Sequence, residues 1–482
     1  MYDRAMSRPT LASKDLRPPE APGPCAGLGA IAFLTATALL CLALPVSAQA
    51  ELVLGKLVLH GIVKTKDDAI LARMRLQPGD PVDYSVLKAA EERLVASDLF
   101  ESVRVWLDLP RADAVRKMYL EKAPEPVDVH VTAEEKVSWF VFPAGSLGGG
   151  DKAAAIVYGD QNQDGHGRQV IAAGQFGESK SFLLAGFRVP IVAFAPLTYA
   201  FDAIFRIEDI RFYDSHRLVL HVPTRIWGGE GQVGWVVTPT VRALVGALYN
   251  RIGVFSPQAD DPAAVAPSFN PVYGNLVALQ LYLLYDDTGA PEGLRHGTRI
   301  SLKNEVSDGF WKSDFDYVKL EFQLELYGHW GQTYPSLAFH SVLNYPTSER
   351  GVPITQLLRA GGPDLRGYIV NEFHGDTLMV LQLEEQVPIF KGLKVPLTSS
   401  RLNVAAAAFV DTGALLERHP GGIAGATARA PLPKLADFHT GLGAGLRLLI
   451  PGVAIPAVKV DFAYGIDVDA FAVTLSVAGG GL

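Results

Sequence analysis

Residues 317–330 read YVKLEFQLELYGHW, a stretch in which polar and apolar side chains alternate without a break from Val318 to Leu326. Strict alternation predicts a β-strand with one polar and one apolar face. Tyr327 and Trp330 end the run, where aromatic residues of a membrane strand would lie at the interface. A strand of a soluble sandwich shows the same alternation, so this stretch alone leaves a membrane barrel and a sandwich open.

The first 50 residues have the features of a signal peptide. Basic residues precede an apolar run that ends in Ala48-Gln49-Ala50, a small-x-small cleavage sequence, so we expect 1–50 to be removed. An uncleaved transmembrane anchor is the alternative, because the run is just long enough to span a bilayer. Cys25 and Cys41 are the only cysteines and both lie here, which excludes disulfides and thiolate metal sites from the rest of the chain.

The rest of the chain predicts a membrane β-barrel. The mean hydropathy is +0.18, yet after the leader no uninterrupted apolar run reaches about 18 residues. An exported chain without spanning helices crosses a membrane only as a closed barrel. Alternation like that of 317–330 recurs at 458–466 and 471–477. At roughly 22 residues per strand and connection, residues 137–482 predict about 16 antiparallel strands, an even number that keeps both termini in the periplasm.

A small α+β domain is predicted for residues 51–133. Its β-α-α-β-β pattern comprises a strand over 52–61, a helix capped at Thr65 that includes Ile70, Leu71 and Met74, a helix over 84–97, and strands around 103–107 and 127–131. The formal net charge of the whole chain is −8. A negative balance argues against nucleic acid as a partner.

An ordered set of motifs resembles the BamA/TamA/FhaC superfamily of outer-membrane assembly and translocation factors. The motifs are YDDT at 285–288, GGPDLRGY at 361–368, AFVDTG at 408–413 and GAGLR at 443–447. In the small domain, residues 76–80 and 99–105 resemble a POTRA module. The resemblance implies an outer-membrane barrel of a Gram-negative cell, preceded by one periplasmic POTRA-like domain whose open strand edge accepts another chain. A rigid spacer is the alternative for that domain.

In that superfamily a loop arginine folds into the barrel lumen and pairs with carboxylates of the wall. The resemblance implies that the loop motif here is Gly361, Gly362, Arg366, Gly367 and Tyr368. It implies Asp411 as the first partner and a glutamate of the preceding strand as the second. Glu384 shares the polar face with Gln382 and Gln386 and lies four residues before Pro388, as the superfamily's glutamate does.

Arginine suits this role because its guanidinium donates two parallel charge-assisted bonds to one carboxylate, which lysine cannot do. An ordinary extracellular turn with a solvated arginine is the alternative.

A loose seam is predicted between the first and last strands of the barrel. Members of the superfamily usually end in an aromatic residue, whereas this chain ends in Val477-Ala478-Gly479-Gly480-Gly481-Leu482. Glycine weakens a closing strand. The residues expected at the seam are Trp139, Phe140, Phe471, Val473 and Leu475.

Other candidate sites lack a required residue. Residues 160–165 resemble the first half of a calcium loop, but Ile171 stands where the closing acidic ligand belongs, so we expect a hairpin turn. His216 and His221 would face opposite sides of a predicted strand. Ser146 lacks the glycine that a nucleophile elbow needs. We therefore expect no metal, no cofactor and no enzyme activity.

The predicted function is protein assembly. The POTRA-like domain would bind unfolded outer-membrane proteins, and the seam would help them enter the lipid of the outer membrane, with periplasmic accessory proteins as further partners. A translocation pore that secretes a dedicated client through the lumen is the alternative, and a passive channel is the third. The resemblance decides among these, because alternation indicates only a barrel.

Overall fold

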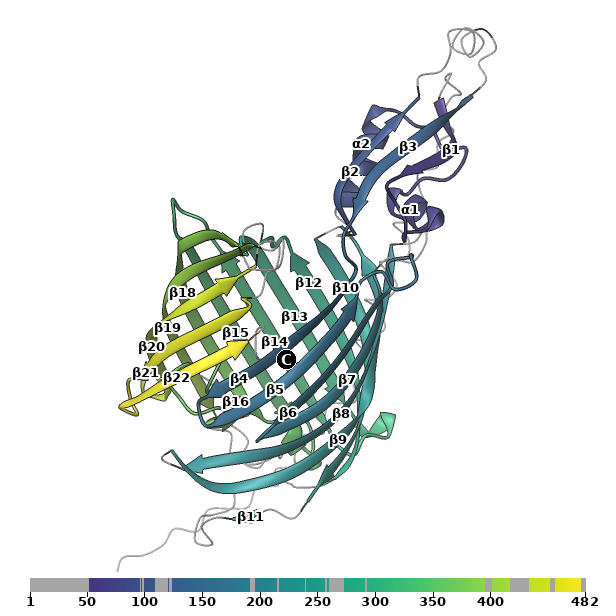
Figure 1. Ribbon diagram of the computed structural model, residues 1–482. Helices are drawn as coiled ribbons and strands as arrows, with labels where there is room; N and C mark the ends of the chain where they lie inside the picture. Colours follow the sequence, from purple (N-terminus) through teal and green to yellow (C-terminus); the bar gives the residue numbers. More distant parts are fainter. Residues whose placement is uncertain are drawn as a thin grey trace, which may run out of the picture. The chain divides into compact units, whose positions relative to one another are not determined.

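A computed structural model places two folded regions, a small mixed domain and a large barrel (Figure 1). It describes residues 52–477 except 96, 98, 109–119, 121–123, 191–195, 215, 239, 256–257, 260–272, 291–292, 395–400, 417–432 and 451–455. The predicted signal peptide and the glycines at 479–481 lie outside the described residues. In the described part, no helix is both long enough and apolar enough to span a membrane.

The small domain packs two helices on a three-stranded sheet. Its elements are β1 (Leu52–His60), α1 (Asp67–Met74), α2 (Tyr84–Val95), β2 (Phe100–Leu107) and β3 (Glu125–Glu135). The strand order is β1-β3-β2, with β1 parallel and β2 antiparallel to the central β3. Alternate residues of β3, such as Val129 and Val131, are fully buried against Ile70 and Leu94 of the helices. Burial of these apolar side chains is the main term that stabilises the domain.

Thr65 does not cap α1, contrary to the expectation from its sequence. The N-cap residue is Lys66, whose side chain makes no capping hydrogen bond. Instead, the Thr65 hydroxyl accepts a hydrogen bond of 2.9 Å from the side-chain amide of Asn162, in the turn after β5. The Thr65 side chain therefore bonds to Asn162 of the barrel and not to the first turn of α1.

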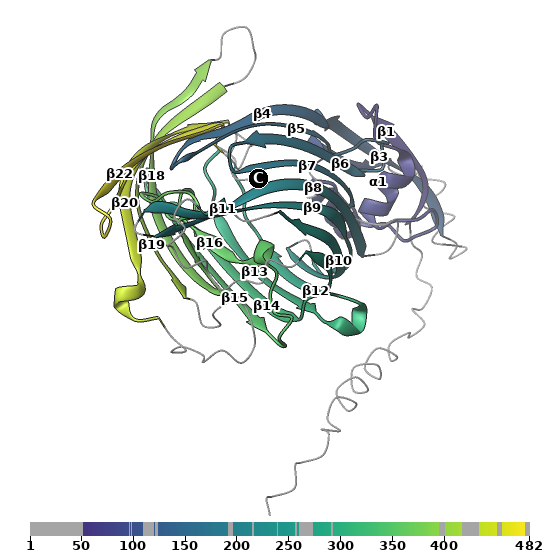
Figure 2. The same ribbon diagram turned by 90° about the horizontal axis from the view of Figure 1, so that it is seen from below.

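The barrel consists of sixteen long antiparallel strands and the two-residue β11, closed into a ring (Figure 2). The strands are β4 (Trp139–Gly148), β5 (Asp151–Asp160), β6 (Gln169–Gly177), β7 (Lys180–Val189), β8 (Leu197–Asp214), β9 (Arg217–Val236), β10 (Val241–Val254), β11 (Gln258–Ala259), β12 (Gly274–Asp286), β13 (Gly297–Ser307), β14 (Tyr317–Tyr327), β15 (Tyr334–Pro346), β18 (Thr377–Lys394), β19 (Arg401–Leu416), β20 (His439–Leu449), β21 (Val458–Gly465) and β22 (Ala470–Val477). The described part of the chain also contains short 3₁₀ helices between strands: η1 (Gly309–Trp311), η2 (Ile354–Gln356) and η4 (Leu435–Asp437).

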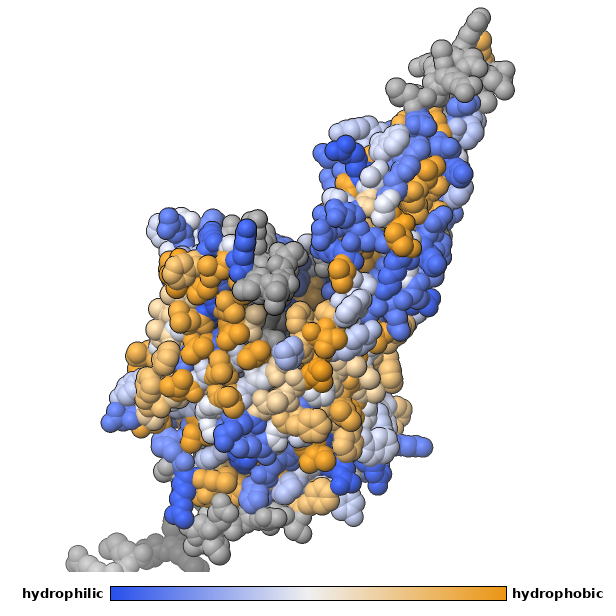
Figure 3. Space-filling view, in the orientation of Figure 1, coloured by the Kyte–Doolittle hydropathy of each residue, from blue (hydrophilic) through white to orange (hydrophobic). Residues whose placement is uncertain are grey.

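The alternation in the sequence separates the outer face of the barrel from the lumen. On β14, Leu320, Phe322 and Leu326 are exposed on the outside, whereas Glu321 and Tyr327 make polar contacts inside. Figure 3 shows apolar side chains over the outer face of the barrel strands. Such a face matches a hydrocarbon environment, and the predicted fold, a transmembrane barrel of about 16 strands after a small α+β domain, is confirmed.

Two expectations about single residues are wrong. Tyr327 does not lie at the lipid interface, because its hydroxyl accepts a hydrogen bond of 2.6 Å from Arg295 inside the lumen. His216 does not lie on a strand with His221: it lies in the turn between β8 and β9, with a positive φ of 67°. The predicted hairpin turn at 160–165 is present, between β5 and β6.

Candidate functional site

The segment between β15 and β18 folds into the lumen and carries the arginine motif. It contains η2 and a two-stranded sheet, β16 (Leu358–Ala360) and β17 (Phe373–Gly375), on either side of residues 361–372. Gly367 has a φ of 100°, and a Cβ there would lie 2.8 Å from the backbone nitrogen of Gly465 on the wall. Only glycine adopts this conformation at such a close approach.

Arg366 binds two carboxylates of the wall. Its Nε and Nη2 donate to the two oxygens of Asp411 on β19, at 2.6 and 2.7 Å, and its Nη1 donates to Glu384 on β18 at 2.5 Å. Arg366 is only 3% exposed and Asp411 is fully buried. A bidentate pair with this geometry fixes both the position and the plane of the guanidinium.

Phe409 holds the guanidinium from a second direction. The guanidinium carbon of Arg366 lies 3.4 Å from the centre of the Phe409 ring. Phe409 precedes Asp411 by two residues on β19, so both side chains point into the lumen. One strand therefore supplies both the carboxylate and an aromatic face, an arrangement that favours a planar cation.

Arg447 and Lys459 extend the network, although the sequence alone predicted no role for either residue. Arg447 on β20 donates to Glu384 at 2.8 Å and to Asp461 on β21 at 2.6 Å. The Nζ of Lys459 lies 3.2 Å from Asp461. Three cations thus meet three carboxylates, and this balance allows charges to be buried together. The sequence signal that points to Arg447 is the GAGLR motif at 443–447.

Tyr368 attaches the end of the motif to the neighbouring turn. Its hydroxyl donates to the backbone oxygen of Thr440 at 2.9 Å and is hydrogen-bonded to Asp467. Its ring packs edge-on against Phe373, with ring centroids 5.2 Å apart. Arg366 and Tyr368 therefore hold the loop on two adjacent parts of the C-terminal wall.

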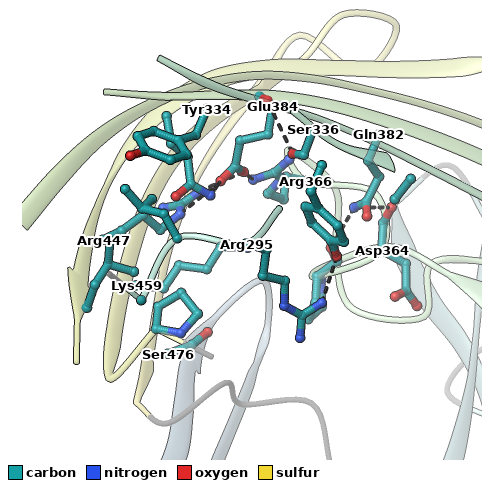
Figure 4. A pocket seen from close by; sticks show the side chains of 18 residues that line it. Arg295, Tyr334, Ser336, Asp364, Arg366, Gln382, Glu384, Arg447, Lys459 and Ser476 are labelled. Carbon is teal, nitrogen blue, oxygen red and sulfur yellow. Dashed lines mark hydrogen bonds and ion pairs between the residues drawn. The ribbon is translucent and has the colours of Figure 1, made fainter. Parts of the chain in front are cut away.

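A cavity of about 410 Å³ opens beside the network (Figure 4). Arg366, Arg447 and Glu384 form one part of its lining, and Arg295 forms another. Ser476 of β22 lines the same cavity. The ion-pair network therefore borders the last strand of the barrel.

The described pairing between β22 and β4, which forms the seam of the barrel, comprises three residue pairs. The described pairs are Leu475–Leu147, Ser476–Ser146 and Val477–Gly145. Of the five residues expected at the seam, only Leu475 pairs across it. Trp139 and Phe140 lie on β4 outside the described pairing, and Phe471 and Val473 lie on β22 outside it. The two strands named in that expectation, β4 and β22, are neighbours in the barrel. The assignment of these five residues to a loose seam stays a prediction.

The small domain contacts the turn between β5 and β6. Lys64 forms an ion pair of 3.1 Å with Asp160, and Arg73 donates to the backbone oxygen of His166 at 2.9 Å. Burial lowers the pKa of Arg73, although the nearby Asp164 partly opposes this. A charged side chain accepts such burial only with partners, so these contacts fix the small domain on the barrel.

No metal site is present among the described residues, since no three histidine, cysteine or acidic side chains there are grouped to hold an ion. Ser146 lies within the short seam pairing. The network around Arg366 consists of charges neutralised by one another. It holds a loop against a wall, and it contains no pairing of a nucleophile with a base.

Fold and site together define a membrane β-barrel with an arginine-bearing loop held inside its lumen. Residues 273–470 match the Omp85 superfamily domain. The fold is similar to that of BamA from Haemophilus ducreyi lacking POTRA domains 1–3, with a TM-score of 0.59 and 14% identity over 88% of this chain and 84% of that one. It is also similar to CdiB from Acinetobacter baumannii, with a TM-score of 0.56 and 11% identity over 89% and 74% of the two chains.

The predicted resemblance to the BamA/TamA/FhaC superfamily is thereby confirmed: the chain carries an Omp85 superfamily domain. Barrels of this superfamily are outer-membrane proteins. At these identities the two solved structures show a common fold. No curated protein matches the sequence.

Proposed function

We propose that this protein inserts unfolded β-barrel proteins into the outer membrane and that its own barrel opens at the β22–β4 seam to do so. The short seam carries this proposal. β4 pairs with β5 from Trp139 to Gly148, whereas the described part of β22 reaches only residues 145–147. Residues 139–144 of β4 lie outside the described part of that pairing, and in this proposal their backbone groups accept a strand of the client.

The sequence after β22 favours an open seam. The residues that would continue the pairing along β4 are Ala478-Gly479-Gly480-Gly481-Leu482, and glycine is a poor strand former. Each net hydrogen bond contributes about 0.5–1.5 kcal/mol, so the three described pairs add only a few kcal/mol to the cost of opening the seam.

The small domain offers a second place for a client strand, and we place it in the periplasm. The outer edge of β1 is covered, because Leu54 donates to the backbone of Asp80 and Val82 donates to that of Leu52, both at 2.8 Å. The other edge of the sheet is β2. Trp106 on β2 is 40% exposed. An extended client segment would add beside β2 through main-chain hydrogen bonds.

A reversible disulfide at the seam tests the proposal. Ser146 and Ser476 face each other across the seam, and replacing both by cysteine changes little volume. The part of the chain after residue 50 has no other cysteine. Purified protein in liposomes should accelerate the folding of a urea-denatured outer-membrane barrel, relative to empty liposomes. The oxidised Ser146→Cys, Ser476→Cys variant should lose this acceleration and regain it with a reducing agent.

The matched control is the Ala144→Cys, Ala155→Cys variant, since these residues pair between β4 and β5, which need not separate. Its disulfide should leave the acceleration intact. Insertion that continues with the seam fully cross-linked would refute the proposal. The alternative, a translocation pore, would then be favoured if the oxidised seam variant still exports a client through the lumen.

A further inference from the structure

The short sheet of β16 and β17 lies inside the ring of barrel strands (Figure 2). We call it the inserted hairpin. Its pairs are Leu358–Gly375, Arg359–His374 and Ala360–Phe373. Side chains of paired residues point to the same side of a sheet, and successive residues alternate. Arg359 and His374 therefore share one face, and Leu358 and Ala360 share the other.

The apolar face packs against the wall formed by β15, β18 and β19. Leu358 and Ala360 are buried in one cluster with Val342 of β15 and with Leu378 and Val380 of β18. This contact excludes water from one face of the inserted hairpin. The same stretch of wall begins the strand that carries Glu384, the partner of Arg366.

The polar face contacts β8. Nη2 of Arg359 lies 2.7 Å from Oε1 of Glu208, and the two side chains are only 13% and 4% exposed. His374 packs edge-on against Phe212 of the same strand, with ring centroids 5.0 Å apart. Glu208 and Phe212 have the same parity on β8, which directs both into the lumen.

Contacts on both sides of the inserted hairpin reinforce the attachment to β8. Ile354 of η2 is buried in a cluster with Ile210 and Phe212 of β8. Glu372, just before β17, pairs with His216 in the turn after β8. The segment therefore contacts β8 in two ways, through the ion pair of Arg359 and through the apolar cluster of Ile354. It also contacts the turn after β8, through the pairing of Glu372 with His216.

β8 and β19 stand on opposite sides of the barrel. Counted from β4 around the sixteen long strands, β8 is fifth and β19 is thirteenth, which separates them by eight strands in either direction. The inserted hairpin thus touches both ends of a diameter. A polypeptide passing through the lumen at this level would meet it.

We propose that the inserted hairpin closes the lumen and that the ion pair between Arg359 and Glu208 holds it against β8. This role is distinct from that of Arg366, which attaches the same loop to the other wall. Breaking the Arg359 contact weakens the attachment of the inserted hairpin to β8, which then depends on the apolar cluster and the ring contact, while Arg366 keeps the base of the segment in place. The lumen then opens without detachment of the whole loop.

Charge around Glu208 makes this pair sensitive to substitution. Arg206 forms an ion pair of 3.3 Å with Glu208, and Lys180 is its direct neighbour across the β7–β8 pairing. Three cations therefore surround one carboxylate. Removing the charge of Glu208 would leave Arg359 facing two like charges, which turns an attractive contact into a repulsive one.

Ion conductance of the purified full-length protein in planar lipid bilayers tests the proposal. Arg359→Glu and Glu208→Gln should each raise the time spent in conducting states by about tenfold or more, as expected for breaking a partly buried ion pair. The double variant Arg359→Glu, Glu208→Arg restores an ion pair with reversed charges and should return conductance toward that of the original protein.

The control is Arg188→Glu, which reverses a lumen arginine on β7 that lies 3.9 Å from Asp202 and is more exposed. It should leave the conducting time unchanged. Heat-dependent electrophoretic mobility confirms that each variant is a folded barrel, and Arg359→Gln replaces Arg359→Glu if the latter does not fold. Folded single variants that stay closed, or a charge swap as conductive as its single variants, would overturn the proposal. The measurement contains no client, so failure of the insertion assay would leave its result unaffected.

Discussion

Arg366 and Arg447 donate to the same oxygen, Oε2 of Glu384, at 2.5 and 2.8 Å. Each arginine also has a carboxylate of its own, Asp411 for Arg366 and Asp461 for Arg447. One glutamate therefore joins the inward loop to three wall strands, β18, β19 and β20, through a chain of ion pairs. A substitution of either arginine therefore changes the electrostatic potential at the other, because both contact Glu384.

Replacing Arg366 by lysine should weaken the folded barrel. Lysine keeps the charge but cannot donate two parallel bonds to Asp411, which is fully buried. Complete loss of one partner of a buried pair costs about 3–5 kcal/mol, so Arg366→Ala should be the more destabilising change and Arg366→Lys the milder one. The midpoint of thermal unfolding, read from heat-dependent electrophoretic mobility, checks the order. Equal midpoints for all three proteins would contradict it, and Arg188→Lys at the more exposed pair serves as the control.

The effects of Arg366→Lys and Arg447→Lys should not add. Both arginines donate hydrogen bonds to Glu384. The first substitution therefore already weakens the interactions of Glu384 that the second substitution would weaken. Residues in one ion-pair network show coupling energies of about 0.5–3 kcal/mol. A double-mutant cycle in urea measures the coupling. Combining Arg366→Lys with Arg350→Lys, whose partner is Asp316, should give additive effects.

Alternation in the sequence predicted the strands because a membrane strand has two different environments, lipid and lumen. On β18 the same argument put Glu384 on the lumen face, and in the structure Glu384 contacts Arg366. Alternation says nothing about which residues of neighbouring strands lie level with one another. That stagger brings Arg447 to Glu384, so this contact could not be derived from one sequence.

The stability of the loop before α1 should depend on pH through Glu135. Burial tends to raise the pKa of Glu135, but hydrogen bonds from Thr65 and from the backbone of Lys64 and Val63 outweigh it and lower the pKa. Because the pKa of Glu135 is lower in the folded state, its carboxylate stabilises the fold when the pH is above the pKa of an unfolded glutamate, about 4.3. This stabilisation is lost as the pH falls through the pKa of Glu135 in the folded state.

Hydrogen exchange of residues 62–66 in the full chain, corrected for its intrinsic pH dependence, measures this effect. Protection should hold from pH 7 to about pH 4.5 and decrease below that range. In Glu135→Gln, protection should already be lower at pH 7, by about 1 kcal/mol, and should change less with acidification. Glu134→Gln, at the neighbouring exposed position, should behave like the original protein. A steeper loss of protection in Glu135→Gln than in the original chain would contradict this assignment.

Glu91→Ala should strengthen the binding of a client strand to the small domain. The side chain of Glu91 on α2 accepts a hydrogen bond of 2.7 Å from the backbone nitrogen of Val105, on the open edge of β2. An incoming strand must displace this carboxylate to reach that donor, and an added strand binds through just such backbone groups. Binding of a denatured outer-membrane barrel to the full-length protein should therefore tighten in Glu91→Ala and remain unchanged in Glu92→Ala, an exposed neighbour with the same charge. Equal affinities for the two variants would mean that clients bind elsewhere than β2.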